Sequence, residues 1–448
     1  MNDGNARLAL LCVAQFVVVL DVTIVAIALP AVGDDLGVGA ADLQWVVSAY
    51  TLTFGGLLML AGRAADLYGR RRAFRAGLLL FAAASLGCAL APTAAALVAV
   101  RALQGAGAAL VAPSALALLV ATHDEGPVRT RALAVWTAAA AGGGATGWVL
   151  GGAISGGLGW GWVFAVNVPI GLAGALVAGR LLPESSEPGA ARLDVPGALT
   201  LTAGVGAVLL GLTRGEADGA SAVTTLAPLA AGAVMLVLFA AIERRAPAPL
   251  LPPGALRAPG LARAVFAALA ITGSTTPAMF LCVLHVQHEG GLAPAEAGLL
   301  FVPMSLAVVA GSLAGPRITA RIGERRAMAG GLVVVAAGAA WLAISAATSV
   351  ALLAPFVLIG GGLGAASVAS TAAGTAADAD RPGLASGLLN TAAQLGSALG
   401  LALLVAPAAA AGFGWGWAGA AAVAIAAALA IAGVRRPVAA AGVRRSPG

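Results

Sequence analysis

Long apolar stretches follow one another along the whole chain and are separated by short polar segments. We count about fourteen, each near the ~20 residues that a helix needs to cross a bilayer. Apolar residues run continuously within each stretch instead of alternating with polar ones, which favours spanning helices over barrel strands. The predicted spans cover residues 8–32, 43–62, 74–91, 94–121, 131–154, 162–181, 195–214, 224–242, 264–286, 297–316, 328–346, 350–373, 385–406 and 417–434.

Basic residues lie almost entirely in alternate gaps between the predicted spans. All 25 of them are arginine, and about 23 occupy one set of gaps, against Arg214 in the other set and Arg101 inside a span. Because the cytoplasmic loops of membrane proteins are enriched in basic residues, this asymmetry predicts that both chain ends lie in the cytoplasm. We therefore assign the net charge of +6 to loops beside anionic lipid, and not to nucleic-acid binding.

The composition narrows the class of protein further. Apolar residues make up 60% of the chain and charged residues 10%, so no sizeable soluble domain fits beside the spans. Cys12, Cys88 and Cys282 show no metal-ligand spacing and neither H-E-x-x-H nor G-x-S-x-G occurs, so we expect no metal, no cofactor and no enzyme. Abundant Ala and Gly without Lys suggests GC-rich coding DNA, and hence the cytoplasmic membrane of a bacterium.

The chain contains an internal repeat at an offset of about 254 residues. Gly69 maps on Gly323, and Arg71 maps on Arg325. Such repeats are typical of secondary transporters, whose substrate site lies between the two halves. We predict a six-helix bundle at 1–182, two linker helices at 183–262, a second six-helix bundle at 263–434 and a cytoplasmic tail at 435–448, all in one monomer.

Only two formal charges lie well inside the predicted spans, Asp21 and Arg101. Each costs about 2.5–3.5 kcal/mol at a helix centre, so such residues usually face a bundle interior or a wet cavity. Burial penalises the ionised carboxylate, so we expect Asp21 to bind and release a proton while Arg101 provides a fixed positive charge. A purely structural role remains open for both, with Asp21 bonded to hydroxyls such as that of Thr23.

A polar loop between the second and third spans carries closely spaced charges and glycines. Asp66 could pair with a nearby guanidinium, and the glycines permit a tight turn. This spacing predicts a cytoplasmic gate, although a plain topological anchor would also need the arginines. The predicted gate residues are Gly62, Asp66, Gly69, Arg70 and Arg71.

Other polar side chains inside spans could line a substrate cavity or form hydrogen bonds between helices. These are Gln15, Thr23, Asn167, Asn390 and Gln394. Separately, His285 and His288 are spaced so that both could lie on one helix face at an external span end. The two histidines could sense pH or bind a metal at that position, or they could simply be polar residues at the membrane interface.

Several ordered motifs resemble those of one family. The gate loop is similar to the signature loop of the major facilitator superfamily, and residues 20–30 and 160–171 resemble motifs of its fourteen-span drug:proton antiporters. The fourth-span motif consists of Arg101, Gln104, Gly105 and Gly107, and the fifth-span motif of Gly143, Gly147, Gly151 and Gly152. Three departures stand out, because Trp148, Leu67 and Gly161 occupy positions where the family usually has Pro, a basic residue and Arg.

The resemblance implies a rocker-switch exporter of hydrophobic or cationic small molecules, such as drugs and antibiotics, driven by inward proton flow. It also implies that Asp21 and Arg101 couple the proton to transport. Two alternatives remain from the residues themselves: a proton-coupled importer of a metabolite, and a non-transporting membrane scaffold or sensor. The sequence does not identify the substrate.

Overall fold

The computed structural model describes residues 3–123, 126–186, 193–217, 222–247, 249–251, 254–345, 349–377 and 382–433. Within these ranges, 14 helical segments are long and apolar enough to cross a membrane, and no strand occurs. The prediction of an all-α protein with this number of spans is therefore confirmed. The predicted tail at 435–448 lies outside the described residues.

The helices fall into an N-terminal part, a linker and a C-terminal part along the chain. Those of the N-terminal part are α1 (Asp3–Leu36), α2 (Ala40–Tyr68), α3 (Arg70–Ala89), α4 (Ala94–Thr122), α5 (Pro127–Leu158), α6 (Gly161–Ala165) and α7 (Asn167–Leu181). The linker helices are α8 (Val195–Ala217) and α9 (Val223–Glu243). The C-terminal part contains η1 (Ala255–Arg257), α10 (Pro259–Leu284), η2 (His285–Glu289), α11 (Pro294–Leu300), α12 (Val302–Ile322), α13 (Glu324–Ile344), η3 (Ser349–Leu352), α14 (Leu353–Ala377), α15 (Pro382–Ala411) and α16 (Phe413–Gly433).

Several helices extend past the apolar stretches that predicted them. The first helix covers Asp3–Leu36 where the apolar pattern marked 8–32. Hydrogen bonds inside a helix do not depend on apolar side chains, so a helix can continue into the headgroup region with polar residues. Three spans are each built from two helical elements: α6 and α7 meet at Val166, α10 continues into η2 at His285, and α11 and α12 meet at Phe301.

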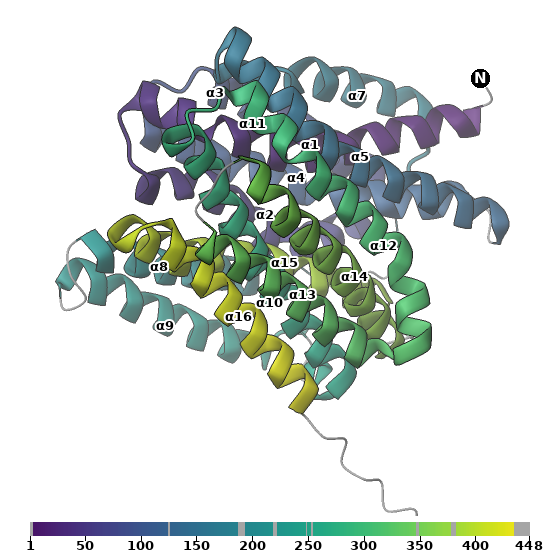
Figure 1. Ribbon diagram of the computed structural model, residues 1–448. Helices are drawn as coiled ribbons and strands as arrows, with labels where there is room; N and C mark the ends of the chain where they lie inside the picture. Colours follow the sequence, from purple (N-terminus) through teal and green to yellow (C-terminus); the bar gives the residue numbers. More distant parts are fainter. Residues whose placement is uncertain are drawn as a thin grey trace, which may run out of the picture.

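The helices form two groups with a separate pair at the edge (Figure 1). In the N-terminal half α1 packs on α5, and α4 packs on α2 and α3. In the C-terminal half α14 packs on α12 and α13, and α10 packs on α15. The linker helices α8 and α9 lie side by side, and α8 also contacts α2 and α15, one helix from each half. The linker pair therefore lies against the seam between the halves.

The two halves meet along two lines of contact. On one line α2 lies against α15, where the Thr391 hydroxyl donates a hydrogen bond to Gly55 O at 3.1 Å. On the other line α5 lies against α11, and the rings of Trp148 and Phe301 stack with centroids 4.3 Å apart. Near the second line, Gln287 Nε2 donates to Ile27 O at 2.9 Å. Trp148, which departs from the family pattern, thus joins the halves, and α5 runs unbroken through it.

The fifth-span glycines determine how closely α5 approaches its neighbours. A Cβ atom at Gly143 would collide with Phe16 O of α1, and one at Gly151 would collide with Ile27 and with the backbone at Ile24. A Cβ at Gly152 would likewise collide with the backbone of Pro294 in α11. Small residues at these positions let helix backbones come together where apolar lipid gives little driving force for association.

We predict that Gly143→Ala lowers the free energy of unfolding by about 1–3 kcal/mol, because the added methyl overpacks a backbone contact. Gly330→Ala is the matched control, since a Cβ there meets no atom within 4 Å and Ala favours a helix. Thermal unfolding of the purified protein in detergent measures both variants. Equal melting temperatures for the two variants would show that the α1–α5 contact is not tight.

Candidate functional site

Asp21 lies at the centre of a buried polar cluster in the N-terminal half. Its Oδ2 accepts a hydrogen bond from Arg101 Nη1 at 2.6 Å, which is also an ion pair. Its Oδ1 accepts from Gln104 Nε2 at 2.8 Å and from Asn167 Nδ2 at 2.7 Å. The side chains of Asp21 and Arg101 are 0% and 1% exposed. Two helices, α4 and α7, thus supply the donors around one carboxylate of α1.

The guanidinium of Arg101 is held from several sides. Its Nη1 also donates to Gln104 Oε1 at 2.6 Å, and its Nε donates to Val46 O of α2 at 2.9 Å. Its Cζ atom lies 4.3 Å from the centroid of the Tyr50 ring, in the geometry of a cation–π contact. Such close coordination compensates part of the cost of burying a charge that arginine cannot lose.

Local sequence explains how these side chains come together. In α4, a Cβ at Gly105 would strike the backbone at Tyr50, and one at Gly107 would strike the backbone of Phe81 in α3. The two glycines of the fourth-span motif therefore let α4 wedge between α2 and α3, which brings Arg101 over the Tyr50 ring. Asn167 begins α7 at the break in the sixth span. Pro169 follows in the first turn, where a missing N–H costs little.

The cluster faces the interior of the N-terminal half. Among the described residues, Asp21 accepts from Arg101 and Gln104 of α4 and from Asn167 of α7, and Asp21, Gln104 and Asn167 are fully buried. The Thr23 hydroxyl, which the sequence offered as a partner of Asp21, donates to Leu20 O instead. Two acceptors near the cluster, Tyr50 Oη and Asn167 Oδ1, are buried with no hydrogen-bond partner among the described residues. Asp21 thus lies neither against lipid nor at a surface.

The loop between α2 and α3 forms the ion pair expected of it. Asp66 Oδ1 accepts from Arg70 Nε and lies 2.8 Å from Arg70 Nη2. Gly69 separates the two helices with a φ of 108°, a conformation that favours glycine. Gly62 and Leu67 lie in the last turns of α2.

Glu184 completes this loop, and the sequence reasoning missed it. Its Oε1 accepts from the backbone N–H of Arg71 at 3.0 Å, at the N-terminus of α3, where a carboxylate is favoured. Its Oε2 lies 3.6 Å from the Nε atoms of Arg71 and Arg72. Glu184 is 113 residues from Arg71 in sequence, so no local spacing predicts this contact.

The second copy of the loop repeats the turn but not the ion pair. Gly323 has a φ of 82°, and Arg325 Nε donates to Ile431 O near the end of α16 at 2.9 Å. Ala320 and Glu324 stand where the first copy has Asp66 and Arg70, so the Asp–Arg pair cannot form here. The two loops are therefore asymmetric.

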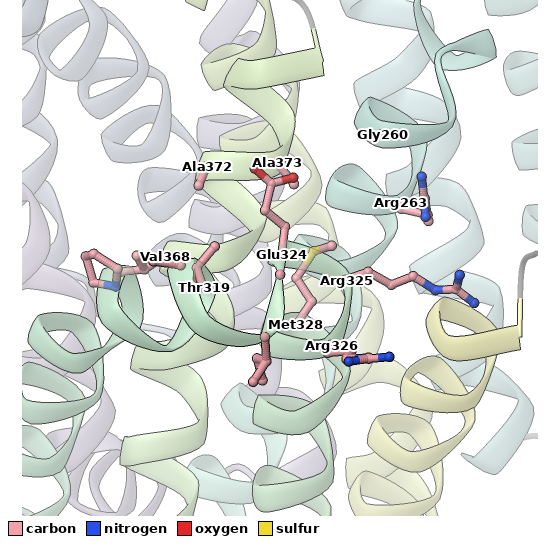
Figure 2. Close-up of a pocket in the computed structure, with 14 residues that line it drawn as sticks. Gly260, Arg263, Thr319, Glu324, Arg325, Arg326, Met328, Val368, Ala372 and Ala373 are labelled. Carbon is pink, nitrogen blue, oxygen red and sulfur yellow. The ribbon is translucent and has the colours of Figure 1, made fainter. Parts of the chain in front are cut away.

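A cavity of about 970 Å³ opens beside the second loop (Figure 2). Figure 2 shows Glu324, Arg325 and Arg326 of α13 among its lining side chains, with Arg263 of α10 nearby. All lining residues come from α10, α12, α13, α14 and the Gly323 turn. This cavity thus lies within the C-terminal half and is not the site between halves that the repeat predicts.

The structure places the other predicted polar residues apart from one another. Gln394 lies beside Gly55, at the contact between the halves, and Gln15 has a buried Oε1 without a hydrogen-bond partner among the described residues. Asn390 is exposed and donates to Ser386 O in its own helix. Asn167 forms a hydrogen bond between helices, one of its two predicted roles, because it donates to Asp21 of α1. The structure therefore brings together Asp21, Arg101, Gln104 and Asn167, and leaves the remaining polar residues outside that cluster.

The opposite end of the molecule carries the two histidines. His285 Nδ1 lies 2.7 Å from Glu289 Oε2, and its ring makes edge contacts with Phe413 and Trp417. His288 Nε2 lies 3.6 Å from Asp34 of α1. No group of three or more potential metal ligands occurs among the described residues.

Gly161, a departure from the family pattern, packs against Ala89 O, where a larger side chain would not fit.

The fold and the sequence are both similar to those of known proteins. The fold shares its overall arrangement with a solved structure of the peptide transporter POT in complex with sulfate, at a TM-score of 0.67 and 17% identity, covering 95% of this chain and 94% of that one. This likeness shows a shared fold of membrane-spanning helices. Residues 11–401 and 264–447 match the Major Facilitator Superfamily. The chain belongs to this superfamily, which confirms the resemblance.

Several proteins similar to this chain are named as export or resistance proteins. The chain is 41% identical to the cephamycin export protein CmcT of Amycolatopsis lactamdurans, over 90% of this chain and 85% of that protein. It is 39% identical to the puromycin resistance protein pur8 of Streptomyces alboniger, over 89% and 80%. It is 35% identical to the multidrug resistance protein Stp of Mycobacterium tuberculosis, over 87% and 73%.

We predict that Arg101→Ala lowers the free energy of unfolding by about 3–5 kcal/mol, because it leaves the Asp21 carboxylate buried without its cation. Adding Asp21→Asn to this variant removes the uncompensated charge and should restore most of the loss. Arg317→Ala, at an exposed arginine, is the control. Thermal unfolding in detergent decides, and an Arg101→Ala protein that melts like the control would show that the ion pair contributes little.

Proposed function

We propose that this chain exports hydrophobic or cationic small molecules, antibiotics among them, across the cytoplasmic membrane of a bacterium in exchange for protons. The similarity to named export and resistance proteins over most of the chain supports export. The observation that carries proton coupling is the buried Asp21–Arg101 pair. The chain works as a monomer in this proposal.

The chemistry of coupling follows from the bonds around Asp21. When the carboxylate is ionised, it holds α1 to α4 through Arg101 and to α7 through Asn167. A proton on Asp21 removes the charge that attracts Arg101, and replaces one acceptor by a donor. The three helices then lose the strongest bond that holds them in this arrangement, so they can shift. Coupling by this route needs no cofactor beyond the proton gradient.

The arginine-rich end, which contains the Asp66 loop, faces the cytoplasm in this proposal, and so do both chain ends. Contacts of α5 with α11 close the opposite, external end. The segment around Glu184 and the Asp66–Arg70 pair fasten the start of α3 to the ends of α7 and α2. We propose that these contacts break and re-form as the halves rock, with the domain limits predicted above.

We predict that Asp21→Asn reduces proton-driven transport to below about a tenth of the wild-type rate while the protein still inserts and folds. The cycle itself passes through a neutral Asp21, so the amide resembles a state that the protein visits. The assay uses proteoliposomes with an acidic interior and follows accumulation of puromycin or ethidium together with the rise of internal pH.

Asp42→Asn is the matched control, because Asp42 is an exposed carboxylate in the first turn of α2. Undiminished transport by Asp21→Asn would remove this residue from the mechanism. Probe leaving with the protons, in place of probe exchanging for them, would identify an importer. If folded wild-type protein transported neither probe, the proposal that it exports this class of substrate would be wrong.

Asp66→Asn separates a gate from an anchor. The Asp66–Arg70 pair is partly exposed, with side chains 32% and 21% accessible, so it is worth at most about 1 kcal/mol of stability. We therefore predict an unchanged melting temperature but a slower transport rate, with probe binding preserved. Wild-type transport by this variant would show that the pair is only a topological anchor.

A further inference from the structure

A second group of buried charges lies where the linker helices meet α2. Asp194, just before α8, and Glu243, the last residue of α9, are each 5% exposed. Arg63, in the last turns of α2, interacts electrostatically with both carboxyl groups. Neither acid belongs to any motif described above, and each lies at the end of an apolar stretch, where sequence alone predicts a solvated loop.

The hydrogen bonds of the two acids leave one oxygen unexplained. Both Glu243 oxygens accept from backbone N–H groups, Oε1 from Leu250 at 3.2 Å and Oε2 from Leu251 at 2.8 Å. Asp194 Oδ1 accepts from Gly197 N at 2.9 Å and so caps the start of α8. Asp194 Oδ2 is buried, and no donor among the described residues reaches it.

The Glu243 carboxyl interacts with that of Asp194, both as a like charge and as a hydrogen-bonding group. Two ionised carboxylates only accept hydrogen bonds, so this contact requires a proton on one of them. Like charges that share a buried site cannot both ionise cheaply. One proton therefore accounts for both the contact and the otherwise unsatisfied oxygen.

The charges of the group balance in the same state. Arg63 interacts electrostatically with Glu243 and Asp194, and Glu243 interacts with Asp194, while Arg244 and Arg245 beyond α9 are exposed. When the two acids share one proton, their single remaining negative charge balances the positive charge of the Arg63 guanidinium. Arg63 also donates to Pro249 O, in the chain that follows α9. Loss of the proton would leave an excess negative charge buried between three elements.

We propose that Asp194 and Glu243 form a second proton-binding site, and that the proton they share fastens the two linker helices to the end of α2. The site is separate from Asp21, since it lies in the linker, at the arginine-rich end. Because α8 contacts both α2 and α15, and Arg63 lies three residues before Asp66, undocking of the linker would reach the proposed gate. The proton concentration at the arginine-rich end would then determine how firmly the linker helices are held against α2.

Infrared spectroscopy tests the shared proton directly. At neutral pH we expect the wild-type protein to show the C=O band of a protonated carboxyl that Glu243→Gln lacks. Glu324→Gln, another carboxylate at the arginine-rich end, is the control and should keep the band. Identical spectra for the wild type and Glu243→Gln would overturn the proposal. The result does not depend on transport, so it stands apart from any failure of the export proposal.

Spin labels at Tyr68→Cys and Arg245→Cys test the docking. Both positions are exposed, and the three native cysteines are buried. Raising the pH until the protonated-carboxyl band disappears should broaden the distribution of distances between the two labels in the protein that is otherwise wild type. In Glu243→Gln, whose amide can still donate to Asp194, the distance should stay narrow throughout. A wild-type distance that stays narrow after the band is lost would show that the proton does not fasten the linker.

Discussion

The N-terminal half is organised around one buried ion pair. Asp21 and Arg101 are out of contact with solvent, and their attraction is strong because little polar material screens it. Such a pair holds together only when further donors and acceptors complete both groups, and Gln104, Asn167 and Val46 O do so here. Removing or adding one charge alters every bond in the cluster at once, which makes the pair suitable as a switch.

The packing around the pair follows from the same requirement. Charges can meet at this depth only if the helices that carry them approach closely, and the glycines of α4 and α5 permit that approach. These glycines have a plain structural explanation, since each one faces a neighbouring backbone. The fourth-span motif therefore combines a charge, the amide that positions it and the small residues that let α4 lie close enough to α1 and α2.

Sequence reasoning predicted what depends on composition and period. The spans, the repeated glycine turns at Gly69 and Gly323 and the isolated charges Asp21 and Arg101 could all be identified from the chain alone. Contacts between residues distant in sequence could not. Asn167 is 146 residues from Asp21, and its role depends on the break between α6 and α7. Glu184 and Glu243 lie at the ends of spans, where a carboxylate is expected to be solvated, and only the packed structure shows what they bind.

In the proposed exchange, Asp21 loses its proton when the exported molecule binds. The most direct measurement is proton release from the purified protein in unbuffered detergent solution when puromycin is added. We expect the wild type to release protons on binding, and Asp21→Asn to bind the same probe without releasing any. Equal proton release from both proteins would rule out Asp21 as the coupling group.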